Sequence, residues 1–283
     1  MLQTDVIDLI VKLALREDVG RKDITTSGII PPAKHVHAEI EAKESGVLYG
    51  VEIAERVFRH VDANLRFLPV AIDGEIMEKG REIAYIDGSA ASVLIAERTA
   101  LNFLGHLSGI ATHTSRFVDK VRGTGVKILD TRKTTPNMRL LEKYAVAAGG
   151  GAHHRMGLYD QVLIKDNHLL ILKDMAIPAI LASSRESVQK NTVIGIEVKN
   201  LKELQEAFKG KPDYILLDNM KPEMIRKAVE VRRKAELKIP FEISGGVNLD
   251  NVREYAETGV ERISIGSLTH SAPWLDISLD IVG

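Results

Sequence analysis

Four basic side chains are the residues of this sequence that are best placed to do chemistry: Arg132, Lys133, Arg155 and Lys165. The first two follow an apolar, strand-like segment at residues 126–129, and the last follows another at residues 162–164. Between these segments, a run of three glycines precedes His154. Several cations beside flexible backbone are what a small, multiply charged anion needs. The pattern therefore predicts an anion-binding site.

Polar or glycine residues also end the strand-like segments that come later in the chain. Glu197 and Asp218 end two of them, whereas Ser244-Gly245-Gly246 and Gly266-Ser267 end the last two. Glycines allow backbone N–H groups to approach phosphate oxygens, and carboxylates receive ribose hydroxyls or hold a hydrated Mg²⁺. One ligand with a phosphate, a polyhydroxyl body and further anions fits this order. A phosphorylated sugar diphosphate is such a ligand.

The elements that must position these residues alternate between strand and helix from residue 126 onward. Strands are expected at residues 126–129, 162–164, 193–198, 214–217, 241–243 and 262–265, and helices at residues 138–148, 169–182, 201–208, 222–235 and 249–258. This alternation predicts an α/β fold with about six parallel strands and right-handed crossovers, which suggests a closed or nearly closed βα barrel. A doubly wound open sheet is the alternative, and the local pattern does not exclude it.

The first part of the chain has a different pattern. Short strand-like segments are expected at residues 35–42, 65–70, 71–77 and 83–86, with helices at the N-terminus, at residues 51–61 and from Ser89 onward. Strands outnumber helices here and the connections are short, which predicts an antiparallel α+β unit before the barrel.

The composition is that of an ordinary globular protein. The chain has 283 residues, of which 45% are hydrophobic and 27% charged, with a formal net charge of −1. There is no global basic field to bind nucleic acid or a membrane surface. The absence of cysteine removes disulfides, thiolate zinc sites and a cysteine nucleophile. The N-terminal segment carries Asp5 and Asp8 in an amphipathic pattern, so we expect a helix, no signal peptide and a cytoplasmic protein.

Other chemistries fit parts of the same pattern. A lysine at a barrel strand end, such as Lys133 or Lys165, is also the nucleophile of Schiff-base aldolases. Glycine pairs after strands are often plain turns, and a non-catalytic phosphate-binding module would have them too. A zinc site at His153-His154 is disfavoured, because adjacent side chains of a regular element cannot both face one metal.

The sequence resembles the quinolinate phosphoribosyltransferase family. The segments that carry the resemblance are ERTALN at residues 97–102, LSGIAT at 107–112, DTRKTTP at 130–136, LEKYAV at 141–146, His154-Arg155, IKDNH at 164–168, LDNM at 217–220, Ser244-Gly245-Gly246 and IGSLTHS at 265–271. They follow one another in family order, and the combination is highly specific. The resemblance implies an N-terminal α+β sandwich domain over residues 1–110, to which C-terminal residues can be added, and a C-terminal βα-barrel domain over residues 111–283.

The resemblance also implies an activity and a set of contacts. The family transfers phosphoribosyl from phosphoribosyl pyrophosphate (PRPP) to quinolinate with Mg²⁺, releases pyrophosphate and CO₂, and so makes nicotinate mononucleotide for NAD biosynthesis. The implied substrate contacts are Arg98, Thr131, Arg132, Lys133, His154, Arg155, Lys165, Glu197, Asp218, Ser244, Gly245, Gly246, Ile265, Gly266 and Ser267. Among these, the implied catalytic residues are Lys133, Lys165, Glu197 and Asp218, and the last two serve Mg²⁺.

A homodimer or larger homo-oligomer is implied as well, in which Arg98 reaches into the neighbouring active site. Such a role would explain a charged residue within an apolar helix. A nicotinate phosphoribosyltransferase of the same fold is the close alternative, because a substrate with a single carboxylate needs fewer of these cations.

Overall fold

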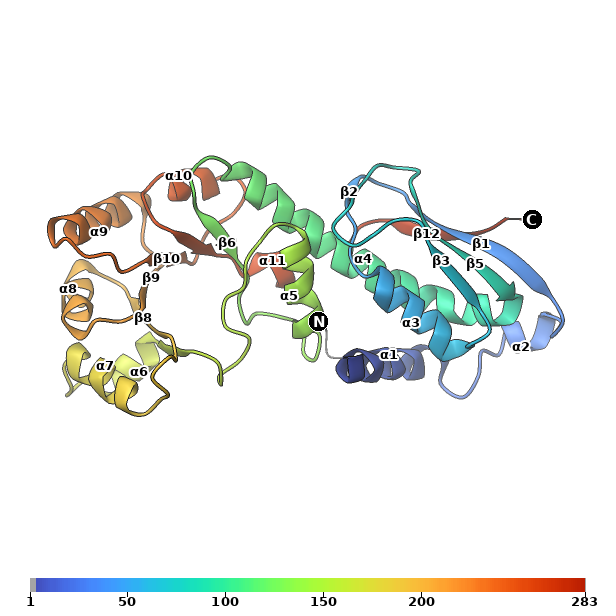
Figure 1. Ribbon diagram of the computed structural model, residues 1–283, viewed down its shortest axis with the longest axis horizontal. Helices are drawn as coiled ribbons and strands as arrows, with labels where there is room; N and C mark the ends of the chain where they lie inside the picture. Colours follow the sequence, from blue (N-terminus) through green and yellow to red (C-terminus); the bar gives the residue numbers. More distant parts are fainter. Residues whose placement is uncertain (1–3, 283) are drawn as a thin grey trace. The chain divides into compact units, whose positions relative to one another are not determined.

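The structure is a computed structural model that describes residues 4–282 and consists of two compact units (Figure 1). Unit 1 comprises the described residues up to Ser115, Thr135–Gly150 and those from Ser271 onward, whereas unit 2 comprises Arg116–Thr134 and Gly151–His270. The sequence predicted a single cut between residues 110 and 111. Each of the two observed units is built from separated segments of the chain. The predicted boundary between residues 110 and 111 stays a prediction.

Unit 1 is built on a four-stranded antiparallel sheet with the order β12-β1-β5-β3. Its strands are β1 (His35–Ala42), β3 (Arg66–Pro69), β5 (Glu82–Ser89) and β12 (Ile277–Val282), and a separate pair joins β2 (Gly46–Val47) to β4 (Ile76–Met77). The expected alternation in β1 buries Ala38, Ile40 and Ala42 on one face. Because β12 pairs with β1, residues near the C-terminus complete this N-terminal sheet.

The helices of this part of the chain are α1 (Thr4–Val19), α2 (Thr26–Ile29), α3 (Val51–Val61), α4 (Ala90–Lys120), whose last residues belong to unit 2, and α5 (Arg139–Ala148). In α4, Ser108 and Thr112 lie one turn apart, and their buried hydroxyls accept the N–H groups of Tyr49 (2.9 Å) and Val47 (2.8 Å). At Gly109 an added Cβ would lie 2.1 Å from a carbonyl oxygen of the segment before β12. Two hydroxyls and a glycine therefore allow main chain to approach α4 closely.

Unit 2 contains a six-stranded parallel sheet with the order β6-β11-β10-β9-β8-β7. Its strands are β6 (Lys127–Leu129), β7 (Val162–Ile164), β8 (Ile194–Val198), β9 (Tyr214–Asp218), β10 (Phe241–Ser244) and β11 (Arg262–Ser264). The first strand, β6, pairs with the last, β11, so the order runs round a circle and does not reverse at a switch point. The predicted βα barrel is confirmed, and the doubly wound sheet is excluded.

The helices that follow the strands of unit 2 are α6 (Asp166–Ile171), α7 (Ile177–Glu186), α8 (Leu201–Gly210), α9 (Pro222–Lys234), α10 (Val252–Ala256) and α11 (Ser267–His270). In Figure 1, α8 and α9 lie on the outer side of β8, β9 and β10. None of the helices within residues 4–282 is long and apolar enough to cross a bilayer.

The segment at residues 151–161 occupies the place between β6 and β7, which are not hydrogen-bonded neighbours in the described sheet. Ala152 forms a parallel bridge with Leu129, and its N–H donates to the carbonyl of Ile128 at 2.8 Å. The N–H of Asp130 donates to the carbonyl of Ala152 at 3.1 Å. This segment extends the barrel wall beyond β6 and carries two of the predicted site residues.

Side chains of mixed polarity fill the barrel. Gly195 on β8 leaves room for the ring of Tyr214 on β9, because an added Cβ would lie 2.2 Å from that ring. In the next layer, strand pairing places Glu197 and Glu242 on either side of Leu216. Tyr214, Leu216 and Glu242 are all buried. The barrel interior therefore holds charged groups below the rim, where they need hydrogen-bond partners.

Two of the predicted elements are wrong. The helix expected at residues 169–182 is two helices, α6 and α7, separated by residues 172–176. Pro178 lies in the first turn of α7, because proline lacks an N–H and fits a helix only near its start. The strand expected at residues 71–77 is mostly a loop, in which the carboxylate of Asp73 accepts two N–H groups at the start of α3.

Candidate active site

A cavity of about 460 Å³ lies at the C-terminal ends of the unit 2 strands. All the predicted site residues except Arg98 line it: Thr131, Arg132, Lys133, His154, Arg155, Lys165, Glu197, Asp218, Ser244, Gly245, Gly246, Ile265, Gly266 and Ser267. The C-terminal ends of parallel barrel strands meet at one rim, so side chains from distant parts of the sequence come together there. The structure thus brings these residues to one cavity, and their contacts with a substrate stay predictions.

The cations lie on one arc of this rim, formed by the ends of β6 and β7 and the segment between these strands. Lys165 directly follows β7, and its Nζ lies 3.6 Å from Oε2 of Glu197. The main chain of Lys133 is held at two points: its N–H donates to Oγ1 of Thr131 (3.1 Å), and its carbonyl accepts the hydroxyl of Thr269 (2.7 Å). Both lysines line the cavity, and the main chain of Lys133 is fixed at two points.

Arg155 is the buried cation of this arc. It is 6% exposed, and its Nη1 donates to the carbonyl of Gln161 at 3.1 Å. Burial lowers the pKa of the Arg155 guanidinium, and the positive charge of Arg132 lowers it further. Two cations that repel each other in a partly desolvated site are stabilised by an anion that contacts both. The arc is therefore prepared for an anionic ligand.

Glu197 and Asp218 form the next arc, at the ends of the neighbouring strands β8 and β9. Burial raises the pKa of the Glu197 carboxyl, the negative charge of Asp218 raises it further, and Lys165 opposes both effects. A shared cation relieves such repulsion, and Mg²⁺ prefers one or two carboxylates together with water and substrate oxygens. Among residues 4–282, no group of three His, Cys, Asp or Glu side chains is placed to hold a metal. Two neighbouring carboxylates are a donor set that suits Mg²⁺ bound together with substrate oxygens, and the binding of Mg²⁺ stays a prediction.

The turn after β10 forms the third arc. Gly245 and Gly246 have φ angles of 96° and 70°, in the left-handed region that favours glycine. An added Cβ at Gly245 would lie 2.1 Å from Oδ1 of Asn219. The helix predicted at residues 249–258 is only five residues long, from Val252 to Ala256. The glycine turn itself, more than a long helix, presents main chain to the cavity, which suits phosphate oxygens.

A buried carboxylate fixes the segment that carries His154. Oδ1 of Asp130 accepts the backbone N–H of His154 at 2.9 Å, and Oδ2 lies 2.8 Å from Nδ1 of His153. Asp130 is fully buried, whereas the imidazole of His153 is 41% exposed. His153 thus pairs with a carboxylate, and both histidines have roles that need no metal.

Sequence reasoning missed several residues of the cavity wall: Leu163, Leu216, Asn219, Glu242, Val247, Ser264 and His270. Glu242 is the most informative of these, because it is 1% exposed and stands between Phe241 and Ile243 in an apolar strand. A charge inside a buried strand was a signal that could have found it. His270 belongs to the IGSLTHS segment, and Asn219 follows a residue that was predicted.

Arg98 lies on α4 in unit 1 and does not line the cavity. Its side chain is 63% exposed, and its Nη2 lies 3.9 Å from Oε1 of Glu97. An exposed ion pair at this distance contributes little to stability. The proposed role of Arg98 in a neighbouring active site stays a prediction.

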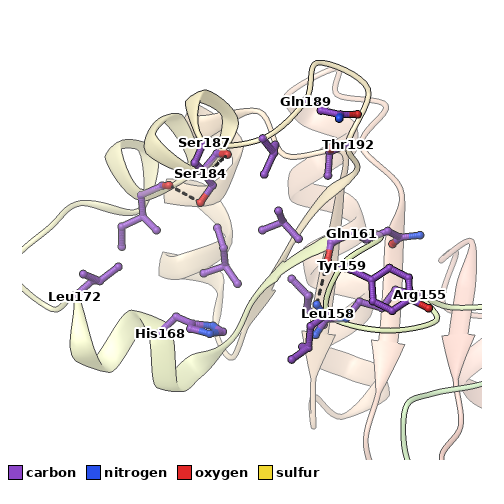
Figure 2. A pocket seen from close by; sticks show the side chains of 15 residues that line it. Arg155, Leu158, Tyr159, Gln161, His168, Leu172, Ser184, Ser187, Gln189 and Thr192 are labelled. Carbon is purple, nitrogen blue, oxygen red and sulfur yellow. Dashed lines mark hydrogen bonds between the residues drawn. The ribbon is translucent and has the colours of Figure 1, made fainter.

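A second cavity, of about 680 Å³, lies beside β7, α6 and α7 (Figure 2). Its lining is mainly apolar or uncharged, and it shares Arg155 and Leu163 with the first cavity. In Figure 2, Arg155 lies at its edge near Leu158 and Tyr159. The charged groups that could act on an anionic substrate gather in the first cavity, so we assign the chemistry to the smaller one.

Comparison with family models gives two matches that together span most of the chain. Residues 23–108 match the model described as quinolinate phosphoribosyl transferase, N-terminal domain, and residues 110–280 match the model for the C-terminal domain.

Individual proteins agree with these matches over the whole length. A probable nicotinate-nucleotide pyrophosphorylase [carboxylating] of Methanocaldococcus jannaschii is 43% identical over 279 residues, covering 96% of both chains. The crystal structure of NadC from Streptococcus pyogenes superposes with a TM-score of 0.93 at 37% identity, covering 100% of this chain and 99% of that one. The nicotinate-nucleotide pyrophosphorylase of Francisella tularensis gives a TM-score of 0.92 at 34% identity, covering 100% and 98%.

Proposed function

This chain belongs to the quinolinate phosphoribosyltransferase family, and we propose that it transfers phosphoribosyl from PRPP to the ring nitrogen of quinolinate. The products are pyrophosphate, CO₂ and nicotinate mononucleotide, an intermediate of NAD biosynthesis. The observation that carries the proposal is the order of groups round one cavity: cations, then two carboxylates, then glycine turns. Each arc suits a different part of the two substrates.

The cation arc binds the two carboxylates of quinolinate in this proposal. Arg132, Lys133, Arg155 and Lys165 supply more positive charge than a substrate with one carboxylate needs. The buried position of Arg155 makes an anion contact strong there, because little water screens it. This excess of cations favours quinolinate over nicotinate.

The other two arcs bind PRPP. The main chain of Ser244-Gly245-Gly246 and Ile265-Gly266-Ser267 receives the 5′-phosphate, while Glu197 and Asp218 receive the ribose hydroxyls. Mg²⁺, held by these two carboxylates directly or through water, would neutralise charge on the pyrophosphate leaving group.

The protein acts by positioning and by electrostatics, and no residue needs to form a covalent intermediate. Loss of pyrophosphate leaves oxocarbenium-like charge at the anomeric carbon, so the ring nitrogen must already lie in line. The cations hold quinolinate there against its repulsion from PRPP, with Lys133 and Lys165 at the rim. Once the nitrogen is alkylated, the bond from the ring to the adjacent carboxylate breaks and CO₂ leaves. The electron pair stays on that ring carbon beside the positively charged nitrogen, and the carbon then takes up a proton.

The assembly and location expected from the sequence are part of the proposal. We propose a homodimer or larger homo-oligomer in which Arg98 completes the neighbouring site, supported by its exposed side chain in a mainly apolar stretch of α4. Analytical ultracentrifugation and complementation between an Arg98→Ala chain and a Lys165→Ala chain test this. A cytoplasmic location is the accompanying expectation, which cell fractionation tests.

The deciding experiment supplies PRPP and Mg²⁺ with either quinolinate or nicotinate and follows pyrophosphate, CO₂ and mononucleotide together. We expect stoichiometric product and CO₂ from quinolinate only. Turnover of nicotinate without CO₂ would move the protein to the sister activity.

If neither substrate gives product, the Schiff-base aldolase remains as the alternative function. In that case borohydride should trap a substrate adduct on Lys133 or Lys165, whereas a phosphoribosyltransferase gives none.

A further inference from the structure

Glu242 lies on β10 inside the barrel, below the cavity rim, with 1% of its surface exposed. Strand pairing places it between Leu216 on β9 and Arg262 on β11. The hydroxyl of Ser264 donates to Oε1, and Nε2 of His154 lies 3.3 Å from the same oxygen. A carboxylate at this depth is costly unless it accepts hydrogen bonds. The partners of Glu242 therefore indicate why the strand carries a charge here.

The imidazole of His154 is held through both of its nitrogens. Nδ1 accepts the backbone N–H of Arg155 at 2.7 Å, so Nδ1 carries no proton. The ring proton is then on Nε2, which faces Oε1 of Glu242 and Oη of Tyr214, each at 3.3 Å. The ring of His154, with Nε2 as donor and Nδ1 as acceptor, thus links the buried carboxylate to the main chain of Arg155.

This link matters because the segment that carries Arg155 has little regular structure. After the bridge at Ala152, the described chain has no helix or strand until β7 begins at Val162. Asp130 holds the backbone of His154 from one side, and Glu242 faces its ring from the other. The place of the buried guanidinium therefore depends on two carboxylates that themselves belong to the barrel.

We propose that Glu242 is a positioning residue for the acceptor substrate: it accepts the Nε2 proton of His154 and so fixes the Arg155 segment that binds quinolinate. The inference rests on the proposed function, and it adds a residue that acts through His154 and does not itself contact quinolinate. The turns assigned to the phosphate of PRPP follow β10 and β11, whereas the segment that carries His154 and Arg155 precedes β7 and is anchored through His154. The effect should therefore fall on quinolinate and spare PRPP.

Two conservative variants separate the effect of the position of the Glu242 oxygen from the effect of its charge. Glu242→Gln keeps an acceptor oxygen at the same reach and removes the charge, whereas Glu242→Asp keeps the charge and withdraws the oxygen from His154. We expect Glu242→Asp to raise the KM for quinolinate about tenfold, which is the size of one lost hydrogen bond to a charged group, and Glu242→Gln to raise it less than about threefold. In both variants the KM for PRPP should stay within about twofold of wild type.

Tyr214 supplies the matched control, because its hydroxyl is the other group within reach of Nε2. Burial raises the pKa of the Tyr214 phenol, and the charge of Glu242 raises it further, so the hydroxyl stays protonated. Tyr214→Phe removes the hydroxyl and keeps the ring that fills the space at Gly195. If Glu242 is the acceptor that matters, Tyr214→Phe changes the KM for quinolinate less than Glu242→Asp does.

A readout that needs no turnover tests the same link. Long-range ¹H–¹⁵N correlation spectra of ¹⁵N-histidine-labelled protein report the tautomer of His154. We expect the Nε2–H form in wild type and in Glu242→Gln, and a mixture of tautomers in Glu242→Asp. If wild type does not use quinolinate, the proposed function fails, and these spectra still decide whether Glu242 positions His154.

Three results would overturn the proposal. One is a larger rise in quinolinate KM for Glu242→Gln than for Glu242→Asp, which would assign the role to charge. Another is an equal rise in KM for both substrates, which indicates a general structural defect. The third is an unchanged His154 spectrum in Glu242→Asp.

Discussion

The ammonium of Lys165 and the carboxylate of Glu197 lie 3.6 Å apart across the ends of β7 and β8. The lysine side chain is 48% exposed and the glutamate side chain only 8%, so the pair joins a solvent-exposed side chain to a buried one. A substrate carboxylate that binds Lys165 and a cation that binds Glu197 would each replace this contact. Without ligand, the pair keeps two opposite charges of the cavity partly neutralised.

Replacement of Lys165 should weaken quinolinate use. In Lys165→Ala a substrate carboxylate loses a charged hydrogen bond of roughly 1.5–3 kcal/mol, so kcat/KM for quinolinate should fall about 10- to 150-fold. Arg132→Ala should act in the same direction. Steady-state kinetics measure both, and Lys209→Ala, which removes an exposed lysine on α8, is the control. Near-wild-type kinetics for both site variants would contradict the assignment of these cations to quinolinate binding.

Neutralisation of Glu197 should raise the stability of the protein and lower its activity. Because its pKa is raised in the folded protein, folding favours the protonated carboxyl, and the ionised form costs stability as the pH rises through the folded pKa. Glu197→Gln should therefore unfold at a higher temperature than wild type at neutral pH and have lower activity. The difference should shrink toward acid, where wild type is protonated too.

Thermal unfolding of both proteins between about pH 4 and pH 8 measures this difference. A lower melting temperature for Glu197→Gln at neutral pH would mean that the ion pair with Lys165 outweighs burial.

Substitution of Gly195 should disturb the barrel interior. A Cβ at this position would lie 2.2 Å from the ring of Tyr214, and overpacking of this kind costs about 1–3 kcal/mol of unfolding free energy. Urea unfolding of Gly195→Ala measures the loss. Gly28→Ala is the matched control, because nothing lies within 4 Å of its added Cβ, and it should unfold like wild type.

Removal of the Asp130 carboxylate should loosen the segment at residues 151–161. Asp130→Ala leaves the backbone N–H of His154 without its acceptor, a loss of about 1–3 kcal/mol for a buried group. Hydrogen exchange should become faster in this segment, while the strands β9 and β10 exchange as in wild type. Asp130→Asn keeps one acceptor oxygen and should be affected less. Unchanged exchange in Asp130→Ala would contradict the anchoring role.

Removal of Mg²⁺ should stop phosphoribosyl transfer. A chelator should abolish pyrophosphate release, and added Mg²⁺ should restore it, because the leaving group otherwise carries uncompensated charge. Asp218→Asn should raise the Mg²⁺ concentration needed for half-maximal rate. Full activity in excess chelator would remove Mg²⁺ from the proposal.

Local sequence pattern was enough to predict most elements of unit 2. The alternation of apolar strands with helices predicted six parallel strands, and the observed bounds of β7, β9 and α9 differ little from the expected ones. Helix and strand periods depend on neighbouring residues, which a sequence displays directly. The same pattern also indicated which polar residues end the strands, and therefore most of the cavity wall.

Pairings between distant residues could not be predicted in this way. The contact of Glu242 with His154, the packing of Tyr214 over Gly195 and the pairing of β12 with β1 join residues that are far apart in the chain. Such contacts depend on strand order and register, which no local period records.

By itself, the sequence indicated the family through its resemblance, and it determined the alternation of strands with helices and the chemical kinds of group at the strand ends, because these follow from residue types at short spacing. Only the pairing of β6 with β11 decided between the barrel and the open sheet. Only the tertiary structure decided that the barrel wall continues through residues 151–161 and that a buried glutamate supports the histidine there. The physical reason is that a charge buried in the barrel must find its partners in space, wherever in the chain they occur.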